Sequence, residues 1–407
     1  MTTILHVCHS DQGGGAAIAA HRLVRAQRDR GIDARMLVLH KLGDDPYVQQ
    51  VSGFAVRSRV RAARFVAKRI GAMLSVSDPQ AMRTLAAIPT GIGRQIIKRA
   101  PDIVHWHWVG GEMLSLSEMA STGIPSVWTC HDEWAFCGAE HYPPDRRFAV
   151  GYGSSLCDAD AVTFRRKQAA WHGWSPVLIC PSHWMAREAA ESALMSGAET
   201  AVIANTLDVD VFRPMERAEA RRCLGLPSDR HIILFGAFLG TTDPRKGFDL
   251  MAAALGELPE RWRPKVALAT FGDGGGVAEL EGFPVVPLGR INDERKLAAV
   301  YSAADMLVAP SRQDNLPNTV VEAQACGTPC VGFAVGGMGD IVERPYHGRL
   351  VAPFDVQALA GAMQEVLDNG ASFDRAWMRS DAVSRFGPDV IVTRHQQLYG
   401  QVMERAR

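Results

Sequence analysis

Short apolar runs alternate with longer amphipathic segments along this chain. An unbroken apolar run is typical of a strand that is covered on both faces, and an amphipathic segment such as 16–30 is typical of a helix. Their alternation predicts parallel sheets covered by helices. The predicted strands are 4–8, 34–39, 103–106, 126–129 and 177–180 in the first half, and 232–235, 266–271, 285–287, 306–309, 330–333 and 350–351 in the second.

The two sets of strands predict an α/β chain with two doubly wound, Rossmann-like domains. Their boundary is expected near 204–221, where ANTLDVDVFRPMERAEAR runs from a turn into a helix. We assign 1–205 to an N-terminal domain and 206–387 to a C-terminal domain, and a helix over 388–407 is expected to cross back to the first. Because such sheets bind ligands beyond the carboxyl ends of their strands, a cleft between the domains is predicted.

The segment 306–332, MLVAPSRQDNLPNTVVEAQACGTPCVG, predicts a strand, a loop and a helix over 317–326. Pro317 suits the first helical position, and Gly327 suits the end of the helix. The start of a helix carries backbone N–H groups without intrahelical partners and a partial positive charge. Asn318 and Thr319 are therefore predicted to bind a phosphate or diphosphate.

Two acids flank this predicted anion site. Asp314 precedes the helix and Glu322 lies inside it. A carboxylate beside an anion site is useful when it accepts hydrogen bonds from neutral hydroxyl groups, so Asp314 is predicted to hold a sugar and Glu322 a ribose. The alternative is that Asp314 is a loop cap and Glu322 a favourable acid near a helix start.

A pair of cations, Arg245 and Lys246, follows the first strand of the second half in FLGTTDPRKGFDLM. Cations in this position can neutralise a diphosphate leaving group. Gly247 allows the close approach that favours Lys246 for this role. The alternative is a pair of solvated side chains.

Two glycine clusters follow predicted strands. Gly14 and Gly15 open the first helix, where the backbone can approach a ligand, although such a turn also serves to pack a helix on a strand. The cluster at 272–276 lacks the spacing of a dinucleotide fingerprint, which argues against a redox enzyme.

A polar and aromatic rim is predicted after the strand 126–129. His131 is expected to bond a hydroxyl of the transferred sugar, while Asp132, Glu133 and Trp134 are expected to orient that sugar or to meet the acceptor. The alternative is a histidine held by the backbone at a strand end. The preceding HWHW at 105–108 is interpreted mainly as core with an acceptor contact as a further option.

Composition excludes several classes of function. The 44 Lys and Arg residues balance 44 Asp and Glu, so no basic surface for nucleic acid is expected. The start lacks the features of a leader and no apolar run reaches about 20 residues, so a cytoplasmic protein is expected. The eight cysteines are scattered, which suits reduced core thiols. Those near His131 fit no zinc spacing, and DAD at 158–160 does not follow a buried strand, so no metal site is predicted.

The segment 56–74 predicts a basic amphipathic helix. Arg57, Arg61, Arg64 and Lys68 recur on one stripe, with apolar residues broadly opposite. Such a helix can rest on an anionic membrane, which would place the protein on the inner face of the membrane beside a lipid-linked acceptor. A solvated helix face is the alternative.

Several blocks of this chain resemble glycosyltransferase family 4, especially bacterial exopolysaccharide transferases. The eight blocks are GGGAAIAAHRL, PDIVHWHW, TCHDEWAFCGAEHY, NTLDVDVFRP, DPRKGF, FGDGGG, SRQDNLPNTVVEAQACGTPCV and GGMGDIVE. The resemblance covers almost the whole chain, and the last two of these blocks are the most specific.

The resemblance implies the GT-B fold and transfer of a sugar from a nucleoside diphosphate to a saccharide or lipid-linked acceptor. It further implies retention of anomeric configuration, with no metal and no other cofactor. Family roles fall on His131, Lys246, Asp314 and Glu322. Two departures are visible: Asp314 stands where the family has Glu, and Gly-Ala-Phe at 236–238 lacks a phosphate-clamping Arg, which Arg245 is predicted to replace.

Two other functions are compatible with these residues. A sugar-nucleotide-binding protein without catalysis would explain the missing Arg. A sugar-nucleotide epimerase shares the two-domain form, but it needs an acid and a base around the sugar rather than the predicted pair of acids.

Overall fold

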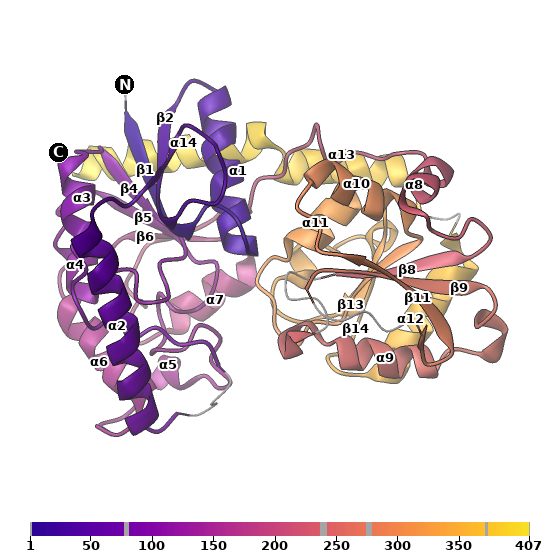
Figure 1. Cartoon of the computed structure of the whole chain (residues 1–407), viewed down its shortest axis with the longest axis horizontal. Coiled ribbons are helices and arrows are strands. Elements are labelled where there is room, and N and C mark those ends of the chain that lie inside the picture. Colours follow the sequence, from indigo (N-terminus) through magenta and orange to yellow (C-terminus); the bar gives the residue numbers. More distant parts are fainter. Residues whose placement is uncertain (1, 77–80, 237–241, 274–278, 371–372, 407) are drawn as a thin grey trace. The chain divides into compact units, whose positions relative to one another are not determined.

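The computed structural model describes residues 2–76, 81–236, 242–273, 279–370 and 373–406 (Figure 1). The chain forms two compact units. Unit 1 consists of Met1–Ile203 together with Val392–Arg407, and unit 2 consists of Ala204–Ile391. The last helix, α14 (Pro388–Arg405), therefore begins in unit 2 and ends in unit 1.

Unit 1 is built on a parallel sheet with the order β3-β2-β1-β4-β5-β6-β7. The chain leaves β1 toward β2 and returns on its other side as β4, so the topological switch point lies between β1 and β4. The strands are β1 (Thr3–Ser10), β2 (Asp33–His40), β3 (Val48–Gln50), β4 (Ile103–Trp106), β5 (Ser126–Thr129), β6 (Val177–Cys180) and β7 (Thr200–Val202).

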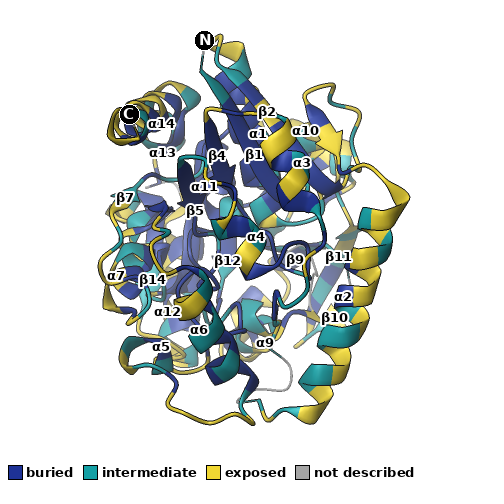
Figure 2. Ribbon diagram, turned by 90° about the vertical axis from the view of Figure 1, so that its left-hand side faces the viewer, coloured by how far each residue is buried: buried dark blue, intermediate teal, exposed yellow. Residues whose placement is uncertain are grey.

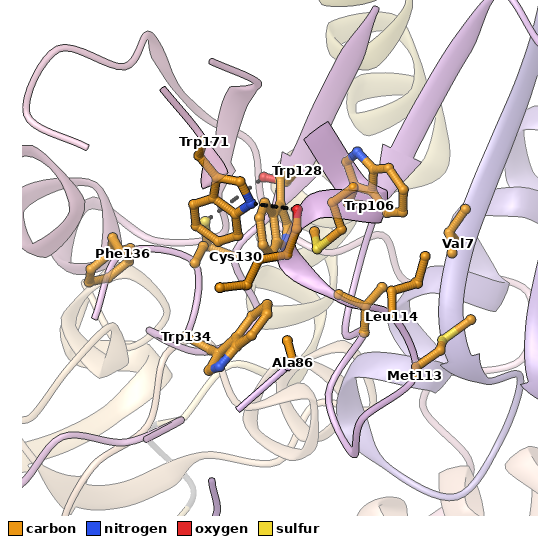
Figure 3. Close-up of a cluster of buried hydrophobic side chains, with 14 of the residues drawn as sticks. Val7, Ala86, Trp106, Met113, Leu114, Trp128, Cys130, Trp134, Phe136 and Trp171 are labelled. Atoms are coloured by element: carbon orange, nitrogen blue, oxygen red, sulfur yellow. Dashed lines mark hydrogen bonds between the residues drawn. The ribbon is translucent and has the colours of Figure 1, made fainter. Parts of the chain in front are cut away.

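Both faces of this sheet are covered. Alternation along β1 sends Cys8 toward the side chains of α1 and Val7 into a larger core that contains Trp106 and Trp128 (Figure 3). The helices of unit 1 are α1 (Gly15–Asp29), α2 (Phe54–Met73), α3 (Ile92–Lys98), α4 (Leu116–Ala120), α5 (Arg147–Val150), α6 (Ala159–Ala170) and α7 (His183–Glu191), with the second part of α14.

Unit 2 repeats the plan with the order β10-β11-β9-β8-β12-β13-β14, in which only β10 is antiparallel. Its switch point lies between β8 and β12. The strands are β8 (His231–Gly236), β9 (Val266–Phe271), β10 (Glu279–Leu280), β11 (Phe283–Gly289), β12 (Met306–Ala309), β13 (Cys330–Phe333) and β14 (Gly348–Val351). The helices are α8 (Arg217–Leu224), α9 (Phe248–Gly256), α10 (Glu294–Ala303), α11 (Asn318–Ala325), α12 (Val356–Asp368) and α13 (Arg375–Phe386), with short 3₁₀ turns at Pro244–Lys246, Glu260–Trp262, Met338–Asp340 and Pro345–His347.

The predicted class of two doubly wound parallel sheets is confirmed. Every strand predicted from an apolar run is present. The missed strands β3, β7 and β10 are short and lie at or beside a sheet edge, where little burial is needed and no apolar run marks them. The helix predicted over 317–326 is shorter, because Pro317 has extended backbone angles and caps α11 rather than starting it.

Candidate functional site

The switch point of unit 2 brings two predicted site residues together. Lys246 ends the 3₁₀ turn after β8, and Asp314 lies in the loop after β12. Lys246 Nζ lies 2.5 Å from Asp314 Oδ2, and the Ser311 hydroxyl donates to the same oxygen at 3.2 Å. Both charged side chains are only partly exposed, at 26% and 15%. Residues far apart in the sequence therefore place a fixed cation and a carboxylate where doubly wound sheets bind ligands.

Two glycines hold these loops against each other. Gly247 has a φ of +67°, and a Cβ atom there would overlap the carbonyl oxygen of Pro310 at the end of β12. Gly336, after β13, has a φ of +53°, and its Cβ would overlap the carbonyl oxygen of Asp314. Only glycine fits these two positions without strain. The close approach seen at Gly247 is to the Pro310 carbonyl, and the approach of a ligand to Lys246 stays a prediction. The role of Gly336 was not predicted, although a Gly-Gly pair at 336–337, shortly after β13, marks it.

The helix α11 begins four residues after Asp314, so its positive end lies next to the ion pair. Pro317 offers no side-chain acceptor to the first turn. Asn318 Oδ1 accepts a hydrogen bond from Asn205 Nδ2 at 3.1 Å, and Thr319 is partly exposed. The predicted anion-binding residues thus lie at the carboxyl edge of the sheet of unit 2.

Glu322 lies deeper in α11 than its predicted contact with ribose suggests. It is 3% exposed, and the Tyr301 hydroxyl of α10 donates to Glu322 Oε2 at 2.7 Å. That hydrogen bond fixes one carboxylate oxygen. The role of Glu322 in donor binding stays a prediction.

Arg245 is held by its own loop. Asp243 Oδ2 accepts from Arg245 Nη2 at 2.7 Å, and Asp243 Oδ1 accepts from the backbone N–H of Arg245. The Arg245 side chain is 35% exposed, so it is positioned but not enclosed. Of the segment where the family Arg is missing, Ala237 and Phe238 lie outside the described residues, as do Gly274, Gly275 and Gly276 of the second glycine cluster.

In unit 1, the glycine loop after β1 opens α1. Gly14 is the N-cap of this helix, and Gly15 is its first residue. A Cβ atom at Gly14 would meet no heavy atom of the described chain within 4 Å, so helix packing does not require this glycine. Asp11 instead closes the loop, since its carboxylate accepts from the N–H groups of Leu42 and Gly43 at 2.7 and 2.9 Å.

His131 and Asp132 follow β5, as predicted, but they are held in different ways. His131 is partly exposed and its Nε2 lies 3.0 Å from His107 Nδ1. Asp132 is buried, where its Oδ2 bonds His141 Nδ1 at 2.6 Å and accepts from Trp108 Nε1 at 2.7 Å. Burial opposes ionisation of Asp132, but its hydrogen bonds and the neighbouring His141 hold the pKa of this carboxyl below its usual value.

The predicted sugar-facing rim is wrong for Trp134. Its side chain is 2% exposed and lies with Trp128 and Trp171 in the aromatic core shown in Figure 3. The indole N–H donates to the carbonyl of Thr84 at 3.0 Å. Glu133 is also buried, at 3%. The chain after His131 turns inward, and the sequence pattern of a polar loop did not show this.

A buried lysine explains this inward turn. Lys167 of α6 is fully buried, and its ammonium donates to the carbonyls of Cys137 at 3.0 Å, of Gly138 at 2.7 Å and of Trp134. It also lies 4.0 Å from the centre of the Trp134 ring. Carbonyl oxygens aimed at one ammonium satisfy it where water is excluded. Lys167 therefore organises the segment that follows His131, and nothing in the sequence around it indicated that role.

The two acids of DAD at 158–160, where no metal site is predicted, have structural roles. Asp158 caps α6 by accepting from the N–H groups of Asp160 and Ala161. Asp160 is buried and pairs with Arg83 at 2.9 Å. Burial opposes its ionisation, but Arg83 and Arg147 hold the pKa of Asp160 below its usual value. Burial and the nearby Asp160 raise the pKa of Glu140 to about 7.

This carboxyl pair predicts a pH-dependent stability. Because the folded state holds the Glu140 proton more tightly than the unfolded state, its contribution is fully present below about pH 4.5 and is lost as the pH rises through 7. Urea unfolding at several pH values should show the wild type losing stability between pH 5 and 8 relative to Glu140→Gln, whose amide cannot ionise. A constant difference between the two proteins over this range would contradict the assignment.

The described cysteines form no disulfide. Cys130 and Cys137 are buried and Cys157 is exposed, and burial is a cause of the raised thiol pKa of Cys137.

A cavity of about 580 Å³ in unit 2 lies at the amino end of the sheet, opposite the end that carries Lys246 and Asp314. It is lined by Arg217, His231 and Asp305 among others. Since ligands of doubly wound sheets bind at the carboxyl end, we place the site at Lys246 and Asp314 rather than in this cavity.

Comparison with known proteins adds independent observations. Residues 13–211 match the family described as Glycosyltransferase Family 4, and residues 230–369 match the one described as Glycosyl transferases group 1. The chain is 34% identical over 327 residues to the D-inositol 3-phosphate glycosyltransferase of Thermobispora bispora. The matched region covers 75% of this chain and 71% of that protein. It is 28% identical over 396 residues to D-inositol 3-phosphate glycosyltransferase 2 of Catenulispora acidiphila, with 90% and 85% covered.

Two solved structures share the fold. Sucrose-phosphate synthase from Thermosynechococcus elongatus matches with a TM-score of 0.69 at 20% identity, covering 99% of this chain and all of that one. Anabaena HepE, solved in complex with UDP and glucose, matches with a TM-score of 0.69 at 17% identity, covering 98% and 100%. At these identities the likeness shows the arrangement of strands and helices.

Proposed function

This chain belongs to glycosyltransferase family 4, and we propose that it moves a sugar from a nucleoside diphosphate to a saccharide or lipid-linked acceptor with retention of anomeric configuration. The observation that carries the proposal is the Lys246 and Asp314 pair at the switch point of unit 2, next to the start of α11. Recognition of a sugar diphosphate requires positive charge at the diphosphate and a group that accepts hydrogen bonds from the hydroxyls of the sugar.

The proposed reaction depends on stabilising the leaving diphosphate. Lys246 and the backbone N–H groups of Asn318 and Thr319 are proposed to take up the negative charge that develops as the bond to the sugar breaks. The diphosphate would compete with Asp314 for Lys246, which frees a carboxylate oxygen for a sugar hydroxyl. Glu322 would accept from the ribose. With this much positive charge from the protein, we propose a reaction that requires no metal and no other cofactor.

The acceptor side is proposed to lie at the carboxyl edge of the sheet of unit 1. His131 is partly exposed there and is proposed to bond a hydroxyl of the transferred sugar. Asp132 acts from the interior, through His141 and Trp108. Gly14 leaves room beside the start of α1, where a ligand is proposed to approach the backbone of Gly14 and Gly15.

A two-stage experiment tests the function. A thermal-shift screen against common nucleoside diphosphate sugars should identify one donor, and mass analysis should then show its sugar on an acceptor from a panel. The panel includes lipid-linked saccharides and, because of the relatives' name, a phosphorylated inositol. Donor binding without transfer would favour a binding protein, and conversion of one free nucleotide sugar into another would reveal an epimerase.

Arg245 is proposed to replace the clamping Arg that the family has after β8. Arg245→Ala should lower turnover about tenfold, since a charge-assisted hydrogen bond to the diphosphate is lost. Arg261→Ala is the matched control, because Arg261 is exposed and pairs only weakly with Asp368, at 3.4 Å. Undiminished turnover of Arg245→Ala under saturating and limiting donor would remove this role.

We also propose that α2 rests on an anionic membrane on the cytoplasmic side. None of the described helices is both long and apolar enough to cross a bilayer. Exposed residues recur along α2 (Figure 2), and they include Phe54 at 76% and Phe65 at 60%. Arg61 and Lys68 lie beside these aromatic rings on the same exposed stripe.

The structure corrects the predicted faces of α2. Its apolar side is used by the protein itself, because Val60 and Ala63 are buried and Ile70 packs against a small core cluster. Arg64 leaves the predicted basic stripe, because its Nε donates to the carbonyl of Gly111 at 2.9 Å. Lipid contact would therefore fall to Phe54, Phe65 and the cations beside them.

Sedimentation with vesicles tests this surface. Binding to phosphatidylglycerol vesicles should exceed binding to phosphatidylcholine vesicles. Arg61→Glu with Lys68→Glu should weaken binding by about a hundredfold, since each surface cation contributes about 1 kcal/mol and each reversal also adds repulsion. Arg187→Glu, at an exposed site on α7, should have little effect. Equal binding of all variants would contradict the proposal.

A further inference from the structure

A chain of hydrogen-bonded histidines runs from α1 to the end of β5 in unit 1. His6 Nδ1 lies 2.9 Å from His107 Nε2, and His107 Nδ1 lies 3.0 Å from His131 Nε2. At the inner end, Gln27 Oε1 lies 2.9 Å from His6 Nε2. Gln27 and His6 are fully buried and His107 is 2% exposed, whereas His131 is partly exposed. The chain thus links the protein interior to a proposed site residue.

This chain has a direction. Burial lowers the pKa of His6 to about 3 and that of His131 to about 4, and it also lowers the pKa of His107, so all three rings are neutral at pH 7. A neutral imidazole donates from one nitrogen and accepts at the other. The carbonyl oxygen of Gln27 can only accept, so His6 carries its proton on Nε2 and accepts at Nδ1. His107 must then donate from Nε2 to His6 Nδ1 and accept at its own Nδ1. His131 must therefore donate from Nε2 to His107 Nδ1.

A second branch holds the Gln27 amide. Gln27 Nε2 donates to the Tyr399 hydroxyl at 3.0 Å, and that hydroxyl lies 2.7 Å from His105 Nδ1. His105 Nε2 in turn lies 2.7 Å from Thr129 Oγ1, with which it shares a hydrogen bond. Tyr399 belongs to α14, so the C-terminal helix takes part in orienting the amide.

These rings are better explained by a hydrogen-bond chain than by a metal site. One nitrogen each from His6, His105 and His107 lie within 4.8 Å of one another, which is close enough for a shared ion. However, both ring nitrogens of all three already have hydrogen-bond partners. A divalent ion would therefore have to displace a hydrogen-bond partner from each of the three rings.

We infer that Gln27, His6 and His107 are positioning residues that hold His131 as the Nε2–H tautomer, so that its Nδ1 can act only as a hydrogen-bond acceptor. A buried row of imidazoles is costly to desolvate, and apolar residues would fill the same space more cheaply. The inference rests on the proposed function, in which His131 meets a sugar hydroxyl. An unprotonated Nδ1 accepts a hydrogen bond from that hydroxyl, whereas a protonated Nδ1 would instead donate one to the hydroxyl oxygen.

Nitrogen NMR tests the tautomer directly. In full-length protein with ¹⁵N-labelled histidine at pH 7, protonated and unprotonated ring nitrogens resonate at well-separated shifts. His131, assigned by its loss in His131→Asn, should show Nε2–H, as should His6 and His107. An Nδ1–H tautomer at His131, or displacement of these signals by one equivalent of zinc, would overturn the inference.

Gln27→Met tests the consequence, because methionine keeps the volume but cannot accept the proton of His6. His131 should then populate both tautomers, and kcat should fall about tenfold with the donor KM unchanged, as expected for one lost hydrogen bond. Tyr399→Phe is the second variant if Gln27→Met fails to fold, and it should mix the tautomers in the same way. Leu23→Met, also buried in α1, should leave tautomer and rate unchanged.

The two proposals fail in different ways. A wild-type protein with no transferase activity but with the Nε2–H tautomer would contradict only the proposed function. An active transferase whose His131 tautomer and kcat are unmoved by Gln27→Met and Tyr399→Phe would contradict only the role of the histidine chain.

Discussion

Replacing Lys246 by methionine is expected to lower the rate of sugar transfer by about 10²–10³, the usual loss when one preorganised group that stabilises a developing negative charge is removed. Lys246 lies beside Asp314 at the switch point of unit 2, and its side chain is only 26% exposed. Methionine keeps the length of the side chain but removes the charge. The measurement is the steady-state transfer rate at saturating donor.

The matched control is Lys296→Met, which removes an exposed lysine from α10. Its transfer rate should equal that of the wild type. Asp314→Asn adds a second test, since a double-mutant cycle with Lys246→Met should show strong coupling between two groups 2.5 Å apart. A Lys246→Met enzyme with the wild-type rate would exclude Lys246 from the charge stabilisation proposed here.

The second large effect is expected on stability. Lys167→Met should lower the free energy of unfolding of unit 1 by about 3–5 kcal/mol, because it leaves the buried groups around the ammonium without their hydrogen-bond donor. These partners are the carbonyls of Trp134, Cys137 and Gly138. Urea unfolding followed by tryptophan fluorescence measures the loss, since Trp134 lies against the ammonium.

A neighbour on the same helix supplies the control. Gln168→Met lies one residue further along α6 and is exposed, so it should change stability by less than about 0.5 kcal/mol. Lys167→Met should also reduce transfer, because the segment after His131 loses its anchor. A stability equal to that of Gln168→Met would show that the carbonyls are satisfied without the ammonium.

The fold could be predicted well because buried strands leave a strong local signal. The runs 103–106, 126–129 and 266–271 correspond residue for residue to β4, β5 and β9. The strand β3 could not be found in this way, because Val48–Gln50 contains a single buried residue and is defined by its pairing with β2. Which strand pairs with an edge strand is known only once the sheet has formed, so the local sequence does not indicate it.

The sequence could indicate those parts of the candidate site that lie after β8 and after β12. Lys246, Asp314, Asn318 and Glu322 each follow a predicted strand, and topology brings the first two into contact. Prediction failed at Trp134, because its burial depends on Lys167 in a helix distant in sequence. A polar loop that turns inward and one that faces solvent have the same composition.

The histidine chain shows the same limit at longer range. His6, His107 and His131 lie on or after three different strands, and parallel register places them in a row. The HWHW run was interpreted mainly as core. It could not predict which ring nitrogens would meet.

The most direct test of the donor site is a crystal structure of the protein with the nucleoside diphosphate sugar that gives the largest thermal shift. The proposed function predicts the diphosphate within hydrogen-bonding distance of the backbone N–H groups of Asn318 and Thr319 and of Lys246 Nζ, with the ribose at Glu322. A diphosphate bound elsewhere, or a ribose directed away from Glu322, would contradict the assignment.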